Sequence, residues 1–129
     1  MVVKKTHWLF LVLIISFTSC EKEKSIEKFT CNLLTISNVV AEETIEVTYK
    51  LEATGDYTIS SWFYMDENGK VELFNPEVPS EIKVSLSHLK KMQSGAAGNV
   101  TEGSIKISYT AISATSSYIG IDQCEQKVN

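Results

Sequence analysis

The stretch from Thr44 to Ala53 constrains the fold more than any other part of the chain, because its side chains alternate strictly in character. Apolar side chains stand at every second position: Ile45, Val47, Tyr49, Leu51 and Ala53. Polar or charged side chains stand between them. A period of two is the pattern of a β-strand with one face in a core and the other in solvent. The segment therefore predicts a half-buried strand.

Further short segments of this kind follow along the chain, separated by residues that favour turns. The sequence predicts additional strands at 29–40, 57–66, 70–75, 81–87, 101–112 and 117–124. It predicts turns at 54–56 and 66–69, a rigid crossing loop at 75–79 and a flexible loop at 94–99. About seven short strands are typical of an all-β, immunoglobulin-like antiparallel β-sandwich. A small closed barrel is the alternative.

A different pattern occupies the start of the chain. Trp8 to Phe17 is an apolar run without a charge, and it follows two lysines, Lys4 and Lys5. The run is long enough for the apolar part of a signal peptide and too short to cross a bilayer as a helix. The sequence therefore predicts an exported protein.

The run ends in Phe17-Thr18-Ser19-Cys20, where small residues directly precede a cysteine. This ending resembles the lipobox of bacterial lipoproteins, and Ser19-Cys20 is similar to the endings found in Bacteroidetes-type lipoproteins. The resemblance implies that the chain is cut after Ser19 and that Cys20 carries a diacylglycerol lipid. An ordinary cleaved signal peptide and an uncleaved anchor are the alternatives.

Three regions follow from these patterns. Residues 1–19 form the predicted lipoprotein signal peptide, and residues 20–28 form a tether. The tether contains Glu21-Lys22-Glu23-Lys24, whose alternating charges have no apolar residue to bury. Residues 29–129 form the immunoglobulin-like domain, which is long enough to fold as one unit.

The charge of the chain argues against nucleic acid as a partner. The net charge is −4, and the 1–19 segment contains two lysines and no acids, so the remainder has 12 − 2 = 10 lysines against 16 acids, or −6. The chain contains no arginine. Nucleic-acid and phosphate sites depend on arginine forks and basic patches. We therefore expect no nucleic-acid partner.

The three cysteines are Cys20, Cys31 and Cys124. With Cys20 lipidated, Cys31 and Cys124 remain as a pair near the two ends of the domain. In an exported protein such a pair predicts a disulfide, and two buried free thiols are the alternative. Cys124 falls on the opposite parity to Ile119 and Ile121, so the prediction requires the strand to end or bulge before Cys124.

A second resemblance concerns the centre of the chain. Its residues are Tyr49, Thr54-Gly55-Asp56, Ile59, Trp62-Phe63-Tyr64, Asp66-Glu67-Asn68-Gly69, Asn75-Pro76 and Pro79. The pattern is similar to the strand–turn–strand centre of the immunoglobulin-like domains of MmpS-type transport accessory proteins. It covers about a third of the chain and implies the same fold. It also suggests the accessory subunit of an envelope transport system as an alternative function.

The chain offers little for catalysis. A hydrolytic triad needs a histidine beside a nucleophile. His7 lies in the predicted signal peptide, and His88 stands in a polar loop beside lysines. Asp66–Gly69 resembles the start of a calcium loop, but the closing glutamate is missing, which favours a hairpin turn. We therefore predict no catalytic residue, no metal site and no cofactor.

The segment 57–66 is apolar on both faces, which a strand of a two-layer sandwich does not need. Trp62 and Tyr64 are assigned to the core. Phe63 and Met65, with Tyr57 at their edge, are then predicted to lie on the outer face. Either the 94–99 loop covers this face, or the face binds a partner.

The sequence thus predicts a non-enzymatic, lipid-anchored protein of the cell envelope that acts as a binding or scaffolding module. The outer membrane is the expected location, with the lipid on Cys20 as the contact with the membrane. A protein or glycan of the envelope is the expected partner, and an enzyme is the most distant alternative.

Overall fold

The computed structural model describes residues 27–36 and 38–127. These residues form six strands, which are β1 (Phe29–Leu34), β2 (Ile45–Asp66), β3 (Gly69–Phe74), β4 (Ser80–Leu86), β5 (Ser94–Ile112) and β6 (Ser117–Gln126). All strand pairs are antiparallel and belong to one sheet. The predicted all-β antiparallel fold is confirmed. Within the described ranges, no helix is long and apolar enough to cross a membrane.

Two long strands form the centre of the sheet. β2 has 22 residues and β5 has 19, and they pair with each other along most of their length. On its other side, β2 pairs first with β4 and then with β3. β5 likewise pairs first with β1 and then with β6. Each long strand therefore contributes one part of its length to each of the two four-stranded halves of the sheet.

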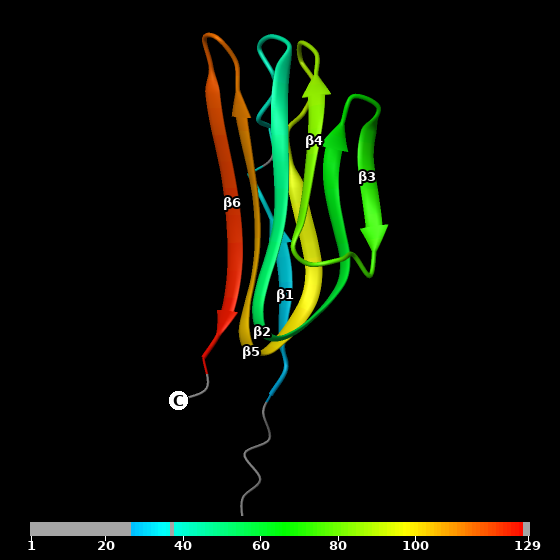
Figure 1. Cartoon of the computed structure of the whole chain (residues 1–129), viewed down its shortest axis with the longest axis vertical. Coiled ribbons are helices and arrows are strands. Elements are labelled where there is room, and N and C mark those ends of the chain that lie inside the picture. Colours follow the sequence, from blue (N-terminus) through cyan, green and yellow to red (C-terminus); the bar gives the residue numbers. More distant parts are fainter. Residues whose placement is uncertain (1–26, 37, 128–129) are drawn as a thin grey trace, which may run out of the picture.

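The sheet folds back on itself to make two layers. In Figure 1, β2 and β5 both run to the lower end of the molecule, turn there and return upward. The β4–β6 layer contains β4, the first half of β2, the second half of β5, and β6. The β1–β3 layer contains β1, the first half of β5, the second half of β2, and β3. Buried side chains from both layers form a single core.

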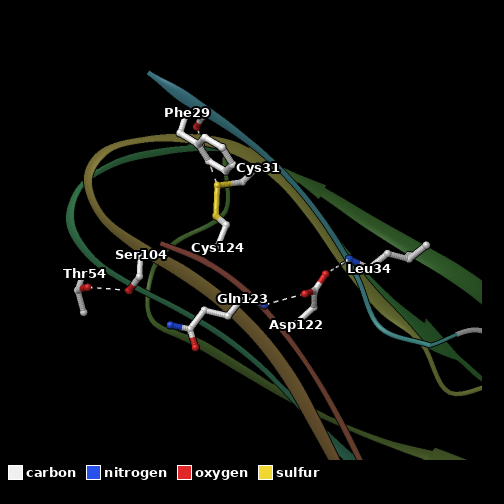
Figure 2. Close-up of a disulfide and its surroundings, with 8 residues drawn as sticks. All are labelled: Phe29, Cys31, Leu34, Thr54, Ser104, Asp122, Gln123 and Cys124. Atoms are coloured by element: carbon white, nitrogen blue, oxygen red, sulfur yellow. Dashed lines mark hydrogen bonds between the residues drawn. A yellow bond between two sulfur atoms is a disulfide. The ribbon is translucent and has the colours of Figure 1, made fainter. Parts of the chain in front are cut away.

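Two glycines that face each other allow this fold. Gly55 of β2 pairs with Gly103 of β5, and their φ angles are +76° and +148°. A side chain at either position would overlap the backbone of the opposite strand. Beside them, the hydroxyls of Thr54 and Ser104 are hydrogen-bonded at 2.8 Å (Figure 2). The chain bends here without leaving the ladder.

This corner explains why six strands are found rather than about seven. The sequence predicted separate strands at 44–53 and 57–66, with a turn at 54–56. The structure instead has one continuous strand through all three segments. Glycine lets the backbone reach a positive φ, and the two strands stay paired through the corner, with one shift in register between Asp56 and Tyr57.

The side chains in the core are largely those that the sequence predicted to face inward. Trp62 is fully buried, and Tyr64 packs against the core. Tyr49, from the other layer, lies 5.4 Å from Tyr64 between ring centroids and donates a 2.8 Å hydrogen bond to the carbonyl of Met65. The indole N–H of Trp62 donates to Ser94 Oγ at 3.1 Å. Every buried side-chain polar atom in the described residues has a partner.

The predicted flexible loop at 94–99 is wrong. These residues form the start of β5, between β1 and β2. Their small side chains have a packing reason: a side chain at Gly98 would overlap the carbonyl of Thr58 and press on Ile105. Glycine and alanine fit because the neighbouring groups already fill the space.

The predicted disulfide joins Cys31 of β1 to Cys124 of β6, with the Cα atoms 6.1 Å apart (Figure 2). β6 pairs with β5 over ten residues without a shift in register, so no bulge precedes Cys124. Cys124 points to the core, and Ile119 and Ile121 point outward, 69% and 57% exposed. The parity conflict therefore disappears because the isoleucines occupy the outer face.

Candidate functional site

The outer face of the β1–β3 layer contains a shallow groove. Leu34 of β1, Gly95 of β5 and Phe63 of β2 stand side by side across the sheet. Asn32, Ala97 and Ser61 form the next row. The hollow has a volume of about 340 Å³ and is lined by Asn32, Leu33, Leu34, Ser61, Phe63, Lys70, Glu72, Ala96 and Ala97. We call it the Phe63 groove.

The groove exists because small residues separate two large ones. Ala96 and Ala97 provide a low floor on β5, while Leu34, 53% exposed, rises on one side. On the other side the ring of Phe63 lies directly over Gly95, where a side chain would overlap it. The ring is half-buried, and this contact holds its orientation.

Charged side chains stand at the Phe63 side of the groove. Lys70 Nζ lies 4.4 Å from the centroid of the Phe63 ring and 3.9 Å from a carboxylate oxygen of Glu72. An ammonium group over an aromatic face is a favourable cation–π arrangement. The apolar floor thus meets a rim that offers an amide, a hydroxyl and an ion pair, which suits reversible binding.

The structure places the three predicted contact residues differently from one another. Phe63 lines the groove. Met65 lies on the same outer face, opposite Lys70, and is half-buried. Tyr57 packs against the core and borders a separate polar hollow near the corner, so its assignment to the face of Phe63 is wrong.

A β-bulge explains the error at Tyr57. The register of β2 against β5 shifts between Ile59 and Ser61, which leaves Ser60 unpaired. An extra residue reverses the parity of the strand. Ile59 and Trp62 consequently both face the core, at 7% and 0% exposure, and Tyr57 shares their face.

One of the two sequence interpretations proposed that the 94–99 segment covers Phe63. In the structure it does not. It pairs with β2 beneath Phe63, and the outer face of the ring stays open to solvent and Lys70. Sequence reasoning also missed Leu34. Its apolar side chain has the opposite parity to Cys31 and Leu33, and this was the available signal of a second apolar face on β1.

The other predicted residues fall outside this groove. Cys20, the predicted lipid site, lies outside the described residues. Cys31 and Cys124 form the disulfide. His88 is exposed, and its Nδ1 lies 2.7 Å from the carbonyl oxygen of Glu42. Across residues 27–36 and 38–127, no group of three or more metal-ligating side chains is found.

Two carboxylates fasten loops at the upper end of the molecule. Glu67, in the β2–β3 turn, accepts hydrogen bonds from Ser87 Oγ and from the Ser87 backbone N–H, which lower its pKa. Glu43 accepts from the hydroxyls of Ser113 and Thr115, and these bonds lower its pKa as well. Both carboxylates stay ionised near neutral pH and hold their loops to the neighbouring segments.

The turn at Asp66–Gly69 is a hairpin turn, in which the backbone N–H of Asn68 donates to Asp66 Oδ1 at 2.8 Å.

Comparison with known proteins adds no relative. No protein-family model, no curated protein and no solved structure matches the chain.

Proposed function

We propose that this chain is a lipid-anchored protein of the cell envelope that binds a protein or glycan partner through the Phe63 groove and performs no catalysis. The anchor part of the proposal rests on the lipobox-like ending at Cys20. The binding part rests on one observation, an open groove with an apolar floor and a polar rim on the outer face of the β1–β3 layer. Such a combination is typical of binding sites on rigid scaffolds.

The direction of the chain agrees with this arrangement. β1 starts at Phe29 at the lower end of the molecule and ends at Leu34, beside the groove (Figure 1). A tether of residues 20–28 would therefore enter at the end nearer the membrane. At 3.3–3.6 Å per residue it reaches at most about 30 Å.

The rigidity of the groove also supports binding. Its floor is part of the central strand β5, which pairs on both sides, and its aromatic wall is held by Gly95 and Lys70. A preformed site loses little conformational entropy when a partner binds.

The binding proposal is tested by substituting Phe63→Ser together with Met65→Ser. Because both side chains are half-buried on the outer face, the free energy of unfolding should fall by only about 1–2 kcal/mol. Capture of envelope proteins or glycans in a pull-down should be lost. The control is Ile112→Ser, which removes a 69% exposed apolar side chain from the other layer. Retained capture by the double variant would contradict the proposal.

The anchor proposal is tested by growth with an alkyne-labelled fatty acid. The wild-type chain should incorporate the label, and Cys20→Ala should not, because only that thiol is offered to the lipid-transferring enzyme. Equal labelling of both chains would contradict the lipoprotein assignment and would leave the binding proposal for the groove unchanged.

A further inference from the structure

β6 is a sheet edge without the usual protection against pairing. It extends over ten residues, Ser117–Gln126, and pairs only with β5 among the described strands. Its outer side chains Ile119 and Ile121 are 69% and 57% exposed. Edge strands with exposed apolar side chains are ready to pair with another strand, and proteins normally block them with lysines, prolines or bulges.

Two of the other three outer edges carry such protection, and the third, β1, is short, with six residues. β3 presents Lys70 and Glu72, and β4 presents Glu81 and Lys83, on their outer faces. β6 contains no lysine and no proline, and its register against β5 is unbroken. Its one carboxylate in the middle, Asp122, is occupied by the backbone N–H of Leu34 at 2.8 Å (Figure 2).

Charge indicates which partner fits this edge. The chain beyond residue 19 has a net charge of 10 − 16 = −6, so two copies repel each other over most of their surfaces. The outer face of β6 from Ser117 to Gln123 is neutral, and so are Ser108 and Thr110, the β5 residues paired with Ile121 and Ile119. The nearest charged residue on β5 is Lys106, which is paired with Gln123 one strand in from the edge. Two copies can therefore meet along β6 without placing like charges opposite each other.

We propose that two copies of the chain associate by antiparallel pairing of their β6 strands. A two-fold axis near Gly120 places Ile119 of each copy opposite Ile121 of the other. This match is self-complementary, as a two-fold interface requires. The two β4–β6 layers then form one continuous eight-stranded sheet, in which main-chain hydrogen bonds supply affinity and the isoleucine pairs supply register.

The pairing leaves the Phe63 groove free, because the groove lies on the outer face of the other layer. It also reverses one copy relative to the other. The dimer therefore presents two grooves, and association along β6 does not depend on the groove or on the lipid.

The mass of the full-length protein in detergent, measured by light scattering with the detergent subtracted, tests the proposal. The wild type should form dimers at tens of micromolar. Ile119→Lys with Ile121→Lys should weaken dimerisation at least tenfold, because lysines on an edge oppose pairing. The matched control is Ile112→Lys, with the same residue type and the same 69% exposure, one strand inward on β5. This control should remain dimeric.

A second set of variants gives an independent measurement. Oxidation of Ile119→Cys with Ile121→Cys should produce a covalent dimer, and Ile112→Cys should not. A wild type that stays monomeric at 100 µM would overturn the proposal. The β6 edge would then be available to pair with a strand of a different protein. Equal loss of dimer in the Ile112→Lys control would also overturn it, because the contact would then be face to face.

Discussion

At the scale of single residues, the fold depends most on Gly55 and Gly103, which face each other where the sheet turns. The sequence marked Gly55 as a turn, because Thr-Gly-Asp favours one, but gave no sign of Gly103 as its partner. The pairing of two glycines 48 positions apart by residue number is a property of register. Register depends on which faces are buried throughout both strands.

Substitution of Gly103 by alanine should destabilise the protein strongly. The residue has φ +148°, and its new side chain would overlap the carbonyl of Thr54. We expect a loss of about 2–4 kcal/mol, from backbone strain and overpacking together. Gly69→Ala is the control, because φ is +114° there but no atom lies within 4 Å. It should lose about 1–2 kcal/mol, measured by urea unfolding. Similar losses at both positions would contradict a crowded corner.

A second residue-scale prediction concerns Glu67. The hydroxyl of Ser87 and, with a smaller effect, its backbone N–H donate to Glu67, and these hydrogen bonds hold the pKa of Glu67 below the ordinary 4.5. A lowered folded-state pKa adds stability that is complete above the unfolded-state pKa and is lost as pH falls through the folded-state pKa. Ser87→Ala should therefore raise the pKa of Glu67 in a ¹³C NMR titration. Its stability deficit should be largest at neutral pH and shrink in acid, and a deficit independent of pH would contradict this linkage.

At the scale of elements, the strands with strict alternation were predicted correctly, and the errors have local physical causes. The faces of 44–53 and 101–112 are found as expected, with Tyr49 and Tyr109 buried. The bulge at Ser60 was not visible, because an extra serine leaves no compositional trace. The 94–99 segment was misjudged because glycine and alanine have low β propensity, whereas their selection here follows from tertiary packing.

The strand assignment of 94–99 can be tested at Gly95. In a flexible loop, Gly95→Ala would be neutral or would stabilise by about 0.4–1 kcal/mol. In the structure the added methyl group overlaps the ring of Phe63, so we expect a loss of about 1–3 kcal/mol. Phe63→Ala should remove most of that loss when combined with Gly95→Ala, because the overlap disappears. Additive losses in this double-mutant cycle would refute the contact.

At the scale of the whole molecule, the architecture is one sheet doubled at a glycine corner, and the edges of its two layers are tied together on one side. β1 and β6 are the first and last strands and belong to different layers. The disulfide and the Leu34–Asp122 hydrogen bond connect them (Figure 2). The sequence predicted this disulfide from cysteine count and compartment, whereas the groove required knowledge of which strands become neighbours.

The disulfide should contribute a large part of the stability. Cys31 and Cys124 are separated by 93 positions, so the bond closes almost the whole domain into a loop. Loop-closure entropy for that length gives about 4–5 kcal/mol. Replacing both cysteines by serine should lower the free energy of unfolding by nearly this amount. Reduction of the wild type should give the same loss, since both treatments release the same loop. Alkylation of the unreduced, purified protein followed by mass spectrometry should find neither thiol modified. Two modified thiols would show that the layers are held by the shared core and the glycine corner alone.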